Sequence, residues 1–136
     1  MTDKLFCYGT LMYPDIMKKV TGKEFDHTPA ILEDYACLEI RDQVFPGVIQ
    51  KDGMRTYGQL VSGISLHDMN MLDRYESDIY KCNRVYVVDE KNTRHAAWCY
   101  VVKDKYSKLL GQHEWDRQRF EHKHKQDYLN DIRGQK

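Results

Sequence analysis

Residues 5–11, Leu-Phe-Cys-Tyr-Gly-Thr-Leu, hold the most distinctive local pattern in this sequence. The stretch Lys4–Tyr8 predicts a short buried strand, which Gly9 and Thr10 interrupt. A glycine at this point permits backbone angles that other residues resist. Such a turn can aim successive N–H groups at one point and thereby bind an anion. Taken alone, the same residues also fit an ordinary turn at the end of a strand.

A helix in the middle of the chain is the second distinctive element. Ser65 and Asp68 have the spacing of a capping box, with Asp in place of the usual Glu, and therefore predict a helix start. We expect the helix to span Leu66–Tyr75. It runs into the sequence Leu-Asp-Arg-Tyr-Glu at residues 72–76.

Glu76 is the candidate acid–base residue. At a rotation of about 100° per residue, it lies about 20° from the centre of the apolar face of this helix. That face is formed by Leu66, Met69 and Leu72. Burial and the helix dipole would both raise the pKa of the Glu76 carboxyl group, which suits proton transfer near neutral pH. The alternative is that the helix ends earlier and Glu76 is a solvated loop residue.

Short strands dominate the rest of the chain. Turn residues at Glu33-Asp34, Lys51–Gly53 and Glu90–Asn92 separate them. Gly58 lies inside one strand and marks a bulge or a close approach of backbone. The further strands are predicted at Thr28–Leu32, Tyr35–Ile40, Phe45–Gln50, Thr56–Val61, Tyr80–Asp89 and Arg94–Val102.

Two more helices, Asp15–Val20 and Trp115–Ile132, complete the prediction. Strands followed by a central and a terminal helix indicate an α+β fold rather than alternating βαβ units. At least six short strands around a small core favour a small mixed or antiparallel β-barrel, closed or nearly closed, with flanking helices.

The composition is that of one globular domain spanning residues 1–136. The chain is 41% hydrophobic and 31% charged, with 21 basic and 21 acidic residues. This apolar share excludes a disordered chain, and the absence of a basic excess argues against nucleic-acid binding. No apolar run reaches the roughly 20 residues of a membrane span, and no secretory signal opens the sequence. We therefore expect a cytoplasmic protein without membrane contact, as a monomer or weak homodimer.

Metal and redox motifs are missing from the sequence. The cysteines at 7, 37, 82 and 99 form no CxxC pair, so they indicate free thiols rather than a zinc ribbon or a thioredoxin-type site. There is also no HExxH, Walker or GxSxG motif.

The order of the motifs resembles the gamma-glutamylcyclotransferase-like superfamily, nearest its short avirulence-induced-gene type branch. LFCYGTL at 5–11 is similar to the family's N-terminal strand and substrate loop, and LDRYE at 72–76 matches its Leu-Asp-x-aromatic-Glu motif. Further similar segments are FPGVI at 45–49, GQL at 58–60, YKCNRVYV at 80–87, AWCYV at 97–101 and the terminal helix at 115–129.

This resemblance implies one substrate pocket, with Glu76 as its catalytic residue. It also implies a barrel of the gamma-glutamylcyclotransferase-like type. The substrate-binding residues would be Tyr8, Gly9, Thr10, Leu11 and Tyr80. The phenol of Tyr80 would hydrogen-bond the acid or the substrate.

Enzymes of this family cyclise a gamma-glutamyl group onto its own α-amine, which releases 5-oxoproline and a free amine. The resemblance therefore implies a gamma-glutamyl cyclotransferase, of acyltransferase or lyase type, for a small gamma-glutamyl amine or peptide. The scheme requires no metal and no organic cofactor.

Two other classes of function stay open. One is a pocket protein that binds a small metabolite without turnover. The other is a nucleic-acid or protein adaptor that uses the C-terminal helix. Residues 103–136 carry nine Lys and Arg against six Asp and Glu, a net charge of +3. This excess is too mild to suggest binding to a phosphate backbone.

Overall fold

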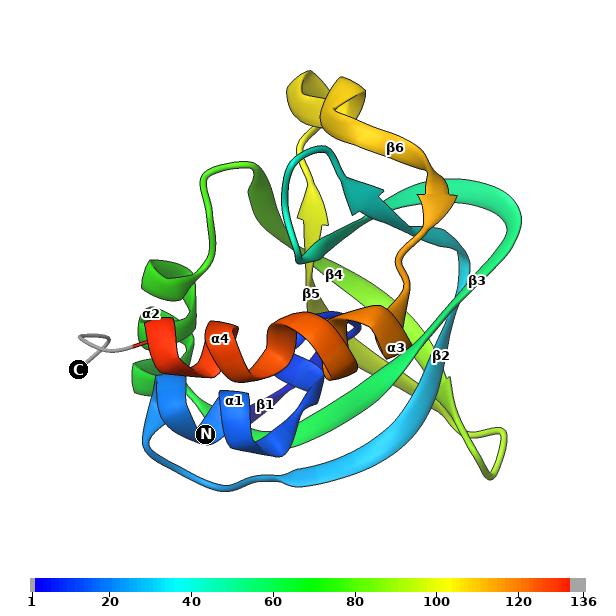
Figure 1. Ribbon diagram of the computed structural model, residues 1–136. Helices are drawn as coiled ribbons and strands as arrows, with labels where there is room; N and C mark the ends of the chain where they lie inside the picture. Colours follow the sequence, from blue (N-terminus) through cyan, green and yellow to red (C-terminus); the bar gives the residue numbers. More distant parts are fainter. Residues whose placement is uncertain (1, 133–136) are drawn as a thin grey trace.

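A closed β-barrel forms the centre of the molecule in the computed structural model, which describes residues 2–132 (Figure 1). Its strands are β1 (Thr2–Cys7), β2 (Asp26–Ile40), β3 (Pro46–Ser65), β4 (Tyr80–Asp89) and β5 (Arg94–Val102). They follow one another in the order β3-β1-β5-β4-β2, and β2 pairs back to β3 to close the ring. β1 and β5 are parallel, whereas the other neighbours in the ring are antiparallel. The predicted α+β barrel with flanking helices is confirmed.

The β2–β3 ribbon differs from the prediction. The expected turns at Glu33-Asp34 and Lys51–Gly53 are wrong, because both segments lie inside long, paired strands. Asp34 and Gly53 have positive φ angles of 63° and 84°, and the Gly53 N–H donates to Asp34 Oδ1 at 3.0 Å. Here β3 has four residues, 51–54, opposite Asp34, so the ribbon bulges and bends instead of reversing. The reversal occurs at residues 41–45.

A sixth strand, β6 (Leu110–Glu114), adds to the outside of the ring and was not predicted. It pairs antiparallel with β2 after a 3₁₀ segment, η2 (Asp104–Leu109). The strand is short and largely exposed. Its mixed sequence, Leu-Gly-Gln-His-Glu, shows no strict alternation of apolar and polar residues, so it carries little strand signal.

The helices gather on one side of the barrel (Figure 1). α1 (Pro14–Thr21) packs against α2 (Leu66–Tyr75), and α2 has the predicted bounds. The C-terminal helix is continuous but has a π-helical centre, and its parts are α3 (Arg117–Arg119), η3 (Phe120–His124) and α4 (Lys125–Asp131). None of the described helices has the length and apolar character required to cross a bilayer.

Strand β1 lies between two hydrophobic cores, because its side chains alternate between its two faces. Leu5 and Cys7 face the helices, whereas Phe6 and Tyr8 face the barrel interior. The helical core includes Ile16, Met17, Val20, Leu72 and Phe120. The barrel core includes Leu32, Val48, Leu60, Val87 and Cys99. The end of β1 is therefore held from both sides, and it carries the Tyr8–Leu11 segment.

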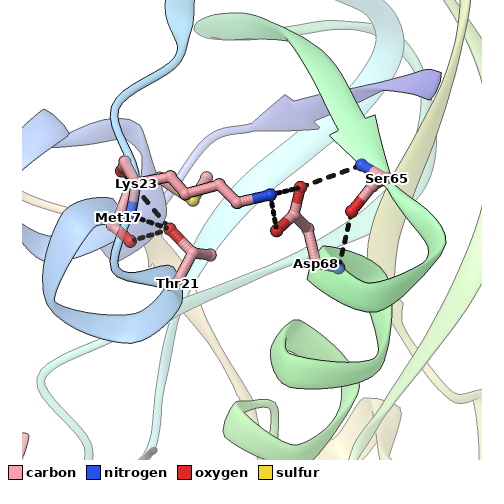
Figure 2. A network of polar contacts seen from close by, with 5 residues as sticks. All are labelled: Met17, Thr21, Lys23, Ser65 and Asp68. Atoms are coloured by element: carbon pink, nitrogen blue, oxygen red, sulfur yellow. Dashed lines mark hydrogen bonds and ion pairs between the residues drawn. The ribbon is translucent and has the colours of Figure 1, made fainter.

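A reciprocal cap fixes the start of α2 (Figure 2). The Asp68 N–H donates to Ser65 Oγ at 3.1 Å, and the Ser65 N–H donates to Asp68 Oδ2 at 2.9 Å. Lys23, from the loop after α1, places its Nζ 3.1 Å from Asp68 Oδ1. Burial alone would raise the pKa of Asp68, but the hydrogen bonds of Ser65 and the Lys23 ammonium lower it below its usual range. The helix that ends at Glu76 thus begins at a fixed point.

Candidate active site

One cavity of about 120 Å³ lies where β1 ends, beside the C-terminus of α2. Its lining includes all six residues that the sequence predicted, which are Tyr8, Gly9, Thr10, Leu11, Glu76 and Tyr80. The structure thus brings together two segments that are about 65 residues apart in the chain. Glu76 is the one carboxylate of the described lining, which contains no Lys, Arg or His side chain. It is therefore the strongest candidate for ionic chemistry in this cavity.

The Tyr8–Leu11 segment turns sharply after β1. Tyr8 is buried and its hydroxyl donates to the Tyr100 carbonyl at 2.6 Å. The N–H groups of Met12 and Tyr13 donate to the Gly9 and Thr10 carbonyls and close a 3₁₀ turn. Within residues 2–132 the Thr10 and Leu11 N–H groups donate no hydrogen bond to the protein backbone. These donors are available to an anionic group.

The position of Gly9 has no room for a side chain. Its φ of −116° is outside the left-handed region, while its ψ of −133° lies in neither the helical nor the extended range. A Cβ atom at this position would lie 2.9 Å from Pro46 Cγ, which is closer than real Cβ contacts. Gly58 shows the same effect more strongly, since its Cβ would lie 2.3 Å from the Cys7 carbonyl oxygen. Two glycines therefore let β3 pack directly against the end of β1.

Glu76 caps the C-terminus of α2. Its N–H donates to the Leu72 carbonyl at 2.9 Å, and its backbone is already extended. The helix therefore ends where the sequence predicted, and the carboxyl group lines the cavity. Burial, and to a smaller extent the nearby Asp73 carboxylate, raise the pKa of Glu76 to about 8.

The apolar face predicted for α2 is only partly correct. Leu72 is fully buried, but Leu66 is 77% exposed. The buried position in the first turn belongs instead to Asp68, whose carboxylate caps the helix and pairs with Lys23. The buried face is therefore rotated, but Glu76 still lies at its margin.

Tyr80, the first residue of β4, does not hydrogen-bond the acid, and the expected alternative, a hydrogen bond to the substrate, stays a prediction. Its hydroxyl donates to the Pro46 carbonyl at 2.5 Å rather than to Glu76. The Tyr80 ring packs beside the Phe45 ring, with 6.5 Å between the two ring centroids. Tyr80 thus connects β4 to the start of β3, and its phenol oxygen lies against the Pro46 carbonyl in the lining of the cavity.

Sequence reasoning missed several aromatic residues of the lining. Tyr75 and Tyr128 lie next to Thr10, and their hydroxyls form a cluster in which Thr10 Oγ1 is 2.9 Å from Tyr75 Oη and 3.5 Å from Tyr128 Oη. The two phenols also contact each other. Tyr75 directly precedes Glu76 in the chain, and this adjacency is the sequence signal that could have placed it in the cavity lining. Tyr128 comes from the C-terminal helix, and only the folded structure brings it here. Other missed lining residues are Phe45, Pro46, Ser77 and Tyr100.

Comparisons with known proteins agree on one family. The sequence profile of the family described as gamma-glutamyl cyclotransferase, AIG2-like, matches residues 5–117. AIG2-like protein C of Arabidopsis thaliana is 26% identical over 127 residues, which cover 92% of this chain and 73% of that protein.

Solved structures share the fold. The solution structure of an Arabidopsis thaliana protein has a TM-score of 0.76 at 21% identity, covering 96% of this chain and 79% of the other. A structure described as gamma-glutamyl cyclotransferase has a TM-score of 0.68 at 16% identity, with coverages of 98% and 89%. At these identities the likeness establishes the barrel and its helices, and the chemistry must be argued from the cavity.

Proposed function

The chain belongs to the AIG2-like gamma-glutamyl cyclotransferase family, and from this premise we propose that it cyclises a small gamma-glutamyl amine or peptide to 5-oxoproline and a free amine. The observation that carries this proposal is the meeting of two groups in one cavity. These are the carboxyl group of Glu76, with its raised pKa, and the free N–H groups of the Thr10–Leu11 turn. The first can move a proton, and the second can bind negative charge.

The first step is the removal of a proton from the substrate's α-ammonium group by the Glu76 carboxylate. Such an ammonium has a pKa of about 8 at a peptide N-terminus, and a higher one in a γ-glutamyl group, where the free α-carboxylate stands beside it. The raised pKa of Glu76, at about 8, brings the acid and the amine closer together. An ordinary glutamate, with a pKa of about 4.3, would face a transfer at least about 5 kcal/mol uphill. Burial of Glu76 thus supports its role as a general base near neutral pH.

The freed amine then attacks the γ-carbonyl carbon of the same molecule. The new C–N bond closes the five-membered ring while the carbonyl oxygen becomes an oxyanion, which the N–H groups of Thr10 and Leu11 can stabilise. The bond to the leaving amine breaks as that nitrogen takes the proton from Glu76, so the carboxylate is restored. The ring nitrogen gives its second proton to the released amine, which departs as an ammonium ion and leaves the neutral amide of 5-oxoproline. Because attack is intramolecular, a cavity that folds the substrate correctly supplies much of the acceleration.

The test is a panel of γ-glutamyl peptides and γ-glutamyl amines, scored for release of 5-oxoproline. We expect release from at least one compound. The matched control is the same compound with its α-amine acetylated, which should bind but not react because its nucleophile is blocked. Binding is measured in parallel by calorimetry. If a compound binds and none releases 5-oxoproline, the protein is a metabolite-binding pocket protein, and the proposed turnover is wrong.

A further inference from the structure

A second carboxylate stands beside Glu76 and is held by a cavity residue. Asp73 lies three residues before Glu76 on α2, a spacing that places the two side chains on neighbouring positions of the helix surface. The Tyr100 hydroxyl, from β5, donates to Asp73 Oδ1 at 2.5 Å. Asp73 itself is exposed, whereas Tyr100 is only 6% exposed and lines the cavity.

Tyr100 connects three elements at this point. Its carbonyl accepts the Tyr8 hydroxyl at 2.6 Å, which ties β5 to the end of β1. Its own hydroxyl reaches the last turn of α2 through Asp73. One buried residue therefore links the segment that carries the free N–H groups to the helix turn that carries Glu76.

We propose that Asp73 and Tyr100 are a positioning pair for Glu76: their hydrogen bond seats the last turn of α2 on β5 and keeps a negative charge next to the catalytic carboxyl group. The inference rests on the proposed function, since it explains how Glu76 stays suited to accept a proton. Neither residue needs to touch the substrate for this role.

Among the groups around Glu76, Asp73 is the charged neighbour that affects the ionisation of its carboxyl group. The ionisable groups around Glu76 on β1, β4, β5, α2 and α4 are thiols and phenols, and burial raises the pKa of each. These groups are Cys7, Tyr8, Tyr80, Cys82, Cys99, Tyr100, Tyr75 and Tyr128. All of them are neutral at pH 7. Among the described residues, Asp73 is the one charged group that acts on the Glu76 carboxyl.

Three variants separate charge from position. Asp73→Asn removes the charge but keeps an acceptor oxygen for Tyr100. Tyr100→Phe keeps the charge of Asp73 but removes the hydroxyl that hydrogen-bonds its carboxylate. Asp78→Asn is the matched control, because Asp78 is an exposed carboxylate two residues after Glu76 that does not line the cavity.

The readout is the pKa of Glu76, measured by NMR titration of its ¹³C-labelled carboxyl group and assigned by its absence in Glu76→Gln. The acidic limb of the pH profile for 5-oxoproline release gives a second reading. Removing the Asp73 charge favours ionisation of Glu76. We therefore expect Asp73→Asn to lower both values by about one pH unit. Tyr100→Phe should lower them in the same direction, and Asp78→Asn should leave them unchanged.

The proposal is overturned if Asp73→Asn leaves the Glu76 titration where it is in the wild type, or if Asp78→Asn shifts it equally. The NMR titration needs no turnover. A wild type that releases no 5-oxoproline but whose Glu76 titration follows Asp73 would contradict the proposed function and support the pair. An active wild type in which the Glu76 titration does not change with Asp73→Asn would support the proposed function and contradict the positioning pair.

Discussion

Replacing Glu76 with Gln should stabilise the protein by an amount that grows with pH. The carboxyl group titrates near 4.5 in the unfolded chain and at about 8 in the folded protein. Between these values the folded protein holds a proton that the unfolded chain has released, so the wild type loses stability as pH rises. A Gln side chain is neutral at every pH and escapes this loss.

The size of the gain follows from the same two pKa values. Each pH unit between them corresponds to about 1.4 kcal/mol. The variant should therefore gain about 3 kcal/mol at pH 7 and about 5 kcal/mol above pH 8, with almost no gain at pH 4. Urea unfolding of the wild type and the variant at pH 4, 7 and 9 measures the difference directly.

An exposed glutamate provides the control for this series. Glu90 lies in the turn between β4 and β5, and Glu90→Gln should give a difference that does not grow between pH 5 and pH 9. If the gain from Glu76→Gln were equally flat, Glu76 would be a solvated loop residue after all. A Gln variant less stable than the wild type at pH 9 would refute the reasoning outright.

Three further substitutions test the site and its support. Gly9→Ala should lower the rate of 5-oxoproline release by about tenfold or more in steady-state kinetics, because a Cβ atom 2.9 Å from Pro46 Cγ must displace the turn. Asp68→Ala should lower the free energy of unfolding by about 1 to 3 kcal/mol in urea, because it removes the carboxylate that accepts the Ser65 N–H and pairs with Lys23, while the backbone N–H of residue 68 still donates to Ser65 Oγ. Tyr128→Phe should raise KM by about fivefold, the worth of one hydrogen bond, with little change in kcat, because the phenol supports the substrate turn without exchanging a proton.

Local signals predicted the elements that carry the site. The spacing of Ser65 and Asp68 identified the start of α2, and the alternating β4 and β5 strands around a short turn were found with their observed bounds. The position of Glu76 followed from counting along that helix. These features depend on neighbours within a few residues, so the sequence alone could reveal them.

Features that depend on distant contacts were not predictable in this way. Asp34 and Gly53 have the composition of turns, and only the pairing of β2 with β3 makes them a bulge. Leu66 was assigned to the core because it is apolar, but Asp68 occupies the buried position through its partner Lys23. Likewise Tyr128 enters the cavity because the C-terminal helix packs beside α1, and nothing local in its sequence indicates this.

The most direct test of the central claim is the rate of 5-oxoproline release by Glu76→Gln relative to the wild type, with substrate binding measured on the same samples. Gln keeps the size and hydrogen-bonding reach of Glu but cannot exchange a proton. The rate should fall by about a hundred- to ten-thousand-fold while binding is retained. If the variant keeps more than about a tenth of the wild-type rate, Glu76 is not the general base of this cavity.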